Sequence, residues 1–182
     1  MDTELDRILA DDYLDGLEVR STAELREQRA ECQAVETQVS YLRRMVQGRH
    51  DIVAGELARR DGGDAPSDVS DLVDRLPEIL ADRIHAPGPG RLPASMEPGE
   101  LHGALADRLA EITGRVPIES PGDADHEALA SAEHDLRELE AEVSRCRRQL
   151  FDRIDAVQAE ITRRYREGVA KVDDLLARGD EA

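Results

Sequence analysis

A pattern of polar residues occurs twice in this chain, at a spacing that places it on one side of an α-helix. The first copy consists of Glu36, Ser40, Arg43, Gln47 and Asp51. The second copy follows 104 positions later, counted from Glu36 to Glu140, and consists of Glu140, Ser144, Arg147 and Asp155, with Phe151 in place of the glutamine. Helical geometry confines the first copy to a stripe roughly 80° wide. Acid, hydroxyl and guanidinium groups presented twice suit a polar ligand with two equivalent halves.

The chemistry of these side chains favours a nucleotide. An arginine offers a planar fork that matches guanine O6 and N7, and it can stack on a base. The carboxylates of Asp51 and Asp155 can accept from guanine N1–H and N2–H, and serine and glutamine can bond phosphate or ribose oxygens. The chain has no P-loop and no GxGxxG motif, which excludes an ordinary mononucleotide fold. A solvated coiled-coil face, inherited by helix duplication, remains an alternative explanation.

The composition favours long helices over a compact globule. Of the 182 residues, 36% are charged and only 2% are aromatic. Bulky side chains for an ordinary core are therefore scarce, and the abundance of Ala, Leu, Arg and Glu is typical of coiled coils. The net charge of −17 argues against direct DNA binding and fits a basic protein partner.

Several classes of protein are disfavoured by what the sequence lacks. Cys32 and Cys146 make no disulfide framework and no cysteine or histidine cluster, so no metal site is expected. No nucleophile with a partner base stands out, so we expect no catalytic residues and no enzyme. The acidic N-terminus and the lack of a long apolar run predict a cytoplasmic protein without a membrane segment.

Two long helices carry the two motif copies. The first is predicted over 21–61, starting at a capping box, and its apolar seam is Cys32, Val35, Val39, Leu42, Val46 and Val53. The second is predicted over 123–178, with the seam Leu136, Leu139, Val143, Cys146, Leu150 and Val157. Steps of three and four residues predict a coiled coil. The fold class is therefore all-α, a long two-helix coiled coil.

Short helices on flexible linkers should complete the chain. Residues 1–20 contain an amphipathic helix over 2–16, and residues 62–122 form a Pro/Gly-rich linker region with helices at 68–85 and 98–113. Each short helix has one apolar side and few residues to bury it against. We therefore expect these helices to be poorly ordered alone and to contact a partner.

The polar stripes select the direction in which the long helices pair. Glu36 and Arg43 occupy e positions of the heptad, as do their counterparts in the second copy. In an antiparallel pair e faces e, which brings both stripes to one side, whereas a parallel pair would separate them. The expected structure is an antiparallel hairpin with residue i opposite residue 190 − i or close to it.

The two copies, read as E-x3-S-x2-R-x3-Q-x3-D on each helix, resemble the RsiG-type anti-sigma factors of filamentous actinobacteria. The resemblance implies that the face binds cyclic di-GMP and that the nucleotide helps to hold a sigma factor of the WhiG, flagellar or sporulation type away from RNA polymerase. The implied ligand contacts are Glu36, Ser40, Arg43, Gln47, Asp51, Glu140, Ser144, Arg147 and Asp155, with Phe151, Arg44 and Arg148 as further candidates. The second copy departs from the pattern at Phe151.

Two other functions fit the same layout. One is a structural or adaptor coiled coil without a ligand. The other is a coiled-coil factor that enters a channel of RNA polymerase, although such factors carry acids at a short hairpin tip and this chain has a long Pro/Gly-rich connection there.

Overall fold

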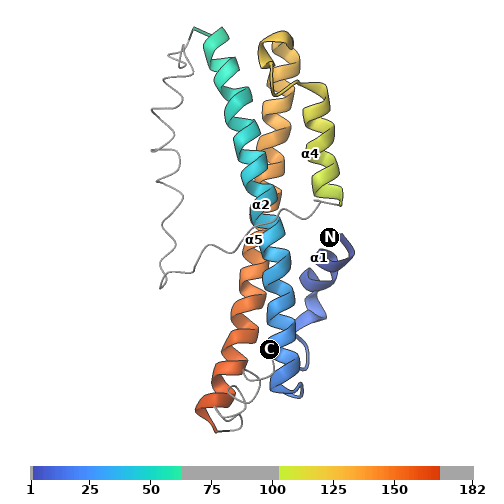
Figure 1. Cartoon of the computed structure of the whole chain (residues 1–182), viewed down its shortest axis with the longest axis vertical. Coiled ribbons are helices and arrows are strands. Elements are labelled where there is room, and N and C mark those ends of the chain that lie inside the picture. Colours follow the sequence, from blue (N-terminus) through green and yellow to red (C-terminus); the bar gives the residue numbers. More distant parts are fainter. Residues whose placement is uncertain (1, 63–102, 169–182) are drawn as a thin grey trace, which may run out of the picture. The chain divides into compact units, whose positions relative to one another are not determined.

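The computed structural model describes residues 2–62 and 103–168, and all regular structure within them is helical. The long helices are α2 (Thr22–Arg60) and α5 (His126–Arg166), and the shorter ones are α1 (Asp2–Leu9) and α4 (Ala104–Arg115). Two short 3-10 helices, η1 (Asp11–Leu14) and η2 (Pro121–Asp123), complete the elements (Figure 1). The all-α prediction is confirmed, and the predicted helix at 68–85 lies outside the described residues.

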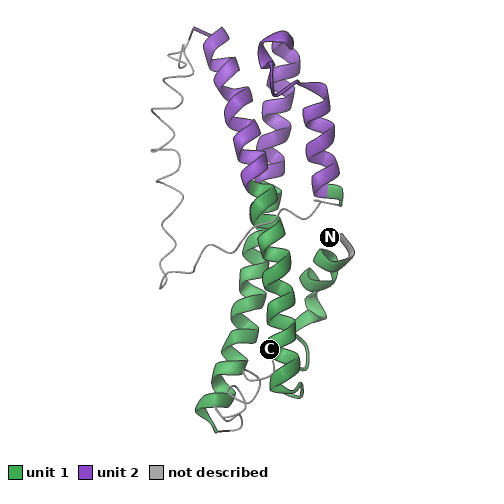
Figure 2. Ribbon diagram, viewed as in Figure 1, with its two compact units in different colours: residues 1–43, 101–104, 141–182 green, residues 44–100, 105–140 purple. Residues whose placement is uncertain are grey.

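The chain divides into two compact units, and each contains a stretch of both long helices (Figure 2). The first unit comprises residues 1–43, 101–104 and 141–182, and the second comprises 44–100 and 105–140. The described part of the first unit holds α1, η1, the N-terminal part of α2 and most of α5. The second holds the rest of α2, nearly all of α4 and the start of α5.

Within each unit α2 and α5 pair in antiparallel fashion, as predicted. In the first unit Ser40 bonds Arg147 and Arg43 bonds Ser144, so the partner's number falls as the first number rises. In the second unit Gln47 bonds Glu140 in the same register. Each partner lies three positions before the one expected from 190 − i.

Apolar residues on the predicted seam are buried in both units. The first unit buries Cys32, Val35, Val39, Leu42, Val143, Leu150 and Val157 at 0–1% exposure. The second buries Val46, Val53, Leu136 and Leu139 completely, together with Leu129, which the predicted seam did not include. Cys146, which was predicted on the seam of the first unit, is only partly buried. Each full burial of an aliphatic side chain is worth about 1.5–3 kcal/mol, so these seams hold each pair of helices together.

The ends of the long helices follow local capping signals. The Ser21 hydroxyl accepts from the Glu24 backbone N–H at 3.2 Å and the Glu24 carboxylate accepts from the Ser21 N–H at 2.6 Å, which confirms the capping box. Asp125 caps α5 by accepting from the Ala128 N–H at 2.7 Å, so the helix begins at His126. Its end at Arg166 precedes the expected position 178, because Gly168 adopts a left-handed conformation with φ of 72°.

The N-terminal segment is not the single helix that we expected over 2–16. The backbone of Ala10 is extended, with ψ of 146°, so α1 ends at Leu9 and η1 follows. The Arg153 guanidinium donates to the carbonyls of Leu9 and Ala10 at 3.4 and 3.5 Å, which satisfies helix-end acceptors. This break turns the Tyr13 side chain into the unit, where only 8% of the residue is exposed.

The expectation that each short helix has few residues to bury its apolar side against is wrong for both short helices that the structure describes. Leu5 and Ile8 of α1 are buried in the first unit, and Leu105, Leu109 and Ile112 of α4 are buried in the second. Ion pairs add to this packing, from Arg7 to Glu31 on α2 and from Arg115 to Asp135 on α5. Figure 1 shows α1 and α4 each running beside the long helices.

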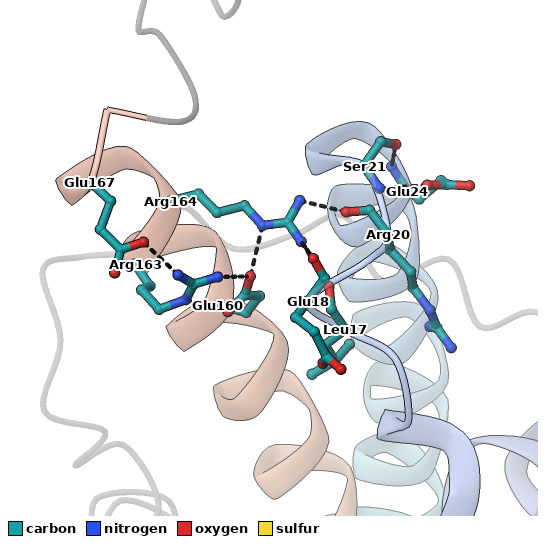
Figure 3. Close-up of polar contacts among 9 residues, drawn as sticks. All are labelled: Leu17, Glu18, Arg20, Ser21, Glu24, Glu160, Arg163, Arg164 and Glu167. Carbon is teal, nitrogen blue, oxygen red and sulfur yellow. Dashed lines mark hydrogen bonds and ion pairs between the residues drawn. The ribbon is translucent and has the colours of Figure 1, made fainter.

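A buried arginine near the end of α5 fixes the turn that precedes α2 (Figure 3). The Arg164 guanidinium donates to the backbone carbonyls of Arg20 at 2.5 Å, Leu17 at 2.7 Å and Glu18 at 3.3 Å. Glu160, one turn earlier, accepts from Arg164 Nε at 2.7 Å. Arg164 is 6% exposed, so its charge needs these partners.

Replacement of Arg164 by methionine should destabilise the protein. The variant retains an apolar stem but leaves three backbone carbonyls without their donor, which costs about 1–3 kcal/mol for each acceptor that water cannot reach. We expect a lower midpoint of urea unfolding, with Arg163→Met, an exposed arginine on the same turn, as the matched control. Equal midpoints for the two variants would contradict the structural role of Arg164.

Stability should also depend on the ionisation of Glu160. Hydrogen bonds from Arg163 and then Arg164 lower the pKa of this carboxyl from 4.5 to about 2. A lowered pKa stabilises the folded state above pH 4.5, and the contribution is lost as the pH falls towards 2. We expect the unfolding midpoints of the parent protein and Glu160→Gln to differ by a constant amount above pH 5 and to converge at lower pH.

The two cysteines should resist intramolecular disulfide formation. In the observed register Cys146 lies opposite the region of Tyr41, which is nine residues from Cys32 or on the order of 14 Å along the helix. Disulfides require Cα atoms within about 7 Å. Burial raises the pKa of both thiols, but Cys32 is fully buried whereas Cys146 is partly exposed. We expect iodoacetamide to label Cys146 first, and mild oxidation to give no internal crosslink by mass spectrometry.

Candidate functional site

In the first unit the two motif copies are joined by reciprocal hydrogen bonds. Arg147 Nε, from the second copy, donates to Ser40 Oγ of the first copy at 2.8 Å. Arg43 Nε, from the first copy, donates to Ser144 Oγ of the second copy at 3.0 Å. The same two residue types meet twice with the roles of the helices exchanged. The local arrangement is therefore approximately two-fold, as the spacing predicted.

Glu36 completes the contact around Arg147. Its Oε1 accepts from Ser40 Oγ at 2.5 Å and from Arg147 Nε at 3.1 Å. The side chain of Glu36 is 17% exposed and that of Arg147 is 35% exposed. This ion pair is shielded on one side and open on the other, so it can hold its geometry and still present polar groups to a ligand.

Phe151, which stands where the pattern has glutamine, lies against Arg147. The guanidinium carbon of Arg147 is 4.7 Å from the centroid of the phenyl ring. A cation over an aromatic face at this distance is worth on the order of 0.5–1 kcal/mol at a partly exposed position. Phe151 cannot make the hydrogen bond that glutamine would make, and it instead supports the plane of the guanidinium.

The remaining second-copy residues of this unit lie towards solvent. Asp155 is exposed and lines a cavity of about 440 Å³ together with Gln158, Thr162 and Arg163. Arg148 is also exposed. Within the described residues, neither Asp155 nor Arg148 is hydrogen-bonded to the cluster of Glu36, Ser40 and Arg147, so the structure does not join them to it.

In the second unit Gln47 and Glu140 meet across the two long helices. Gln47 Nε2 donates to Glu140 Oε1 at 3.1 Å. Both residues line a cavity of about 260 Å³ that also includes Asp51, whose side chain is 50% exposed. Arg44 is exposed on the same helix. The structure thus brings three predicted ligand contacts together in this unit.

The same cavity contains residues that the sequence pattern did not identify. His50 Nε2 lies 3.1 Å from Glu133 Oε1, and His50 Nδ1 lies 3.7 Å from Asp51 Oδ1. Arg137 also pairs with Glu133 and lines the cavity. In the sequence, this cluster is indicated by the spacing of Glu133, Arg137 and Glu140, which places the three side chains on one side of α5.

The described residues offer neither a metal site nor a membrane span. Within residues 2–62 and 103–168, no group of three or more His, Cys, Asp or Glu side chains is arranged to hold a metal ion. No helix in these ranges is long and apolar enough to cross a membrane.

Comparison with known proteins identifies one protein family. A model of the family described as RsiG-like matches residues 11–80 and 117–179, well over half of the chain. The matched segments include both copies of the polar motif and both long helices. No curated protein matches the chain significantly.

Proposed function

The chain belongs to the RsiG-like family. We propose that it is an anti-sigma factor that requires bound cyclic di-GMP to hold its sigma factor. Membership of the family suggests the anti-sigma role. The identity of the nucleotide and the type of sigma factor go beyond what membership of the family suggests, and both are part of the proposal. We propose that cyclic di-GMP contacts both copies of the polar motif, and that the protein with its nucleotide sequesters a WhiG-type sigma factor.

The reciprocal contact of the two copies is the observation that carries the proposal. Ser40 meets Arg147, and Arg43 meets Ser144, so each pair combines one residue from each copy. Cyclic di-GMP consists of two identical guanylate halves related by a two-fold axis. A ligand of that symmetry can make the same contacts with both pairs, which a single mononucleotide cannot.

The arginines have the chemistry to recognise guanine. Arg147 uses Nε for its bonds to Glu36 and Ser40, and within the described part of the chain its terminal nitrogens make no hydrogen bond. Those nitrogens form the edge that matches guanine O6 and N7. Glu36 and Ser40 orient this edge before the ligand arrives, which lowers the entropic cost of binding.

The net charge supports a basic protein partner. A chain with a net charge of −17 attracts the basic surface with which a sigma factor approaches promoter DNA. Occupation of that surface would block access to RNA polymerase and to DNA. In this proposal the protein acts in the cytoplasm by binding alone, with no catalytic step, no metal cofactor and no direct contact with DNA or membrane.

Removal of either arginine should weaken this activity without unfolding the coiled coil. In Arg43→Ala or Arg147→Ala the loss of a bidentate contact should weaken nucleotide binding by about 1–3 kcal/mol. Both positions lie off the buried seam, so helicity by circular dichroism should persist. Isothermal titration of cyclic di-GMP, with and without the sigma factor, measures the effect.

Arg145→Ala is the matched control, because Arg145 is exposed on α5 and belongs to neither motif copy. It should bind like the parent protein. Nucleotide-dependent capture of the sigma factor by Arg43→Ala and Arg147→Ala at parental affinity would refute the assignment of the site.

A further inference from the structure

Two arginines of the first unit, Arg26 and Arg29, are held in place by neutral side chains. Arg26 Nη2, on α2, donates to the Tyr165 hydroxyl on α5, and its guanidinium carbon lies 5.8 Å from the centroid of the Tyr165 ring. Arg29 Nη1, one turn later on α2, donates to the Gln158 amide oxygen on α5. Gln158 Nε2 in turn donates to the Thr162 hydroxyl at 3.1 Å. The two guanidinium groups are therefore oriented without being neutralised.

Neither arginine of this pair meets a carboxylate within the described part of the chain. The chain has 41 acidic and 24 basic residues, and arginines such as Arg7 and Arg147 do meet carboxylates across helices. Residues three positions apart on a helix are neighbours, with Cβ atoms about 5–6 Å apart, so the two like charges of the pair repel each other. The arrangement costs stability, and an anion would relieve that cost.

The pair is accessible from solvent, because both arginines are partly exposed. Within the described residues, Arg29 Nε is the one nitrogen of the two guanidinium groups that is buried without a hydrogen-bond partner. Arg26 Nε, Arg26 Nη1 and Arg29 Nη2 also make no hydrogen bond there but are not buried, so they reach the surface. An anion that approaches from solvent can bond these nitrogens, and its charge would also compensate the part of Arg29 that is shielded from water.

The pair continues the side of α2 that carries the polar motif. Arg29 precedes Glu36 by seven residues and Arg43 by fourteen, so all three occupy e positions of the heptad. Seven residues of helix span about 10 Å. Arg29 and the serine–arginine contacts belong to the same unit. A protein that covers the polar motif in the first unit would therefore reach the pair as well.

We propose that Arg26 and Arg29 bind an acidic side chain of the partner protein. A guanidinium fork matches the two oxygens of a carboxylate, and two neighbouring forks can hold one carboxylate from two sides. The net charge of −17 repels a polyanion such as nucleic acid, which disfavours phosphate as the occupant. A free small carboxylate would bind weakly at a partly exposed pair, whereas one carried by a protein gains the rest of an interface.

The pair gives the interface specificity as well as attraction. The chain as a whole attracts a basic surface, but a lysine or arginine placed opposite this pair would be repelled. One acidic residue in an otherwise basic partner surface would therefore fix where that surface lies along α2.

This inference deepens the proposed function, since identification of the partner as the sigma factor rests on it. Arg26→Gln combined with Arg29→Gln should weaken binding of the nucleotide-loaded protein to the sigma factor at least tenfold. Its affinity for cyclic di-GMP alone and its helicity should be unchanged, because neither residue belongs to the motif or to the buried seam. Arg26→Lys combined with Arg29→Lys keeps the charges without the forks and should lose less affinity than the glutamine variant.

The matched control is Arg59→Gln combined with Arg145→Gln, which removes the same charge from exposed positions of the two long helices. It should bind the sigma factor like the parent protein. Equal sigma factor affinity of the glutamine variant and this control would overturn the proposal.

A second measurement uses the unmodified full-length protein and needs no sigma factor. The probe is Nα-acetyl-glutamate amide at constant ionic strength, with Nα-acetyl-glutamine amide as the uncharged control, and the side-chain Nε–H signals of arginine are followed by nuclear magnetic resonance. The glutamate probe should shift the signals of Arg26 and Arg29 at least threefold more than that of the exposed Arg145. Equal shifts at all three arginines, or equal responses to both probes, would overturn the proposal.

Two further outcomes separate the possible failures. A shift that appears only after residues 169–182 are deleted would assign the pair to the chain's own acidic end and overturn the partner assignment. If the parent protein binds no sigma factor, the proposed function fails, and the glutamate titration alone decides whether the pair recognises carboxylates.

Discussion

A shift of α5 by one helical turn against α2 would separate each arginine of the polar motif from the serine that it contacts. The apolar seam prevents this shift in the first unit, because Val39, Leu42, Val143 and Leu150 are fully buried and a new register would expose part of them. Burial of such side chains is worth more than the hydrogen bonds at the polar face, which contribute about 1 kcal/mol each. The seam therefore sets the register, and the register sets the site.

Features that depend on the periodicity of residue types could be predicted from the sequence. Heptad spacing predicted both long helices, and the e positions of the two motif copies predicted the antiparallel direction that brings both copies to one side. The expected register would have placed Arg43 opposite Arg147, and the observed register lies three positions earlier, so that Arg43 contacts Ser144. The predictions of the helices and of their direction succeed because each uses residues a few positions apart on one helix, or an exact repeat. The capping box at Ser21 is equally local.

Features that depend on contacts between segments far apart in the chain could not be predicted from the sequence. The break of the N-terminal helix at Ala10 is accompanied by bonds from Arg153, more than 140 residues away. Arg164 donates to the carbonyls of Leu17 and Arg20 across a similar separation in the sequence. No local sequence pattern predicts which backbone carbonyls an arginine will bond. The burial of α1 and α4 likewise requires knowledge of the surface that the long helices leave uncovered. The cluster of His50 and Glu133 also combines residues from two helices.

The substitution of Phe151 for glutamine shows how a duplicated site can become unequal without losing its pairing. In the second unit Gln47 donates to Glu140, the residue that begins the second copy. Glu36 begins the first copy and accepts from Arg147 and Ser40, and the phenyl ring at position 151 offers it no amide donor. Phe151 then stacks on the same guanidinium. Arg147 is thus held from two sides, by an ion pair and by a ring. Because each serine–arginine pair takes one residue from each copy, damage to either copy disturbs both pairs.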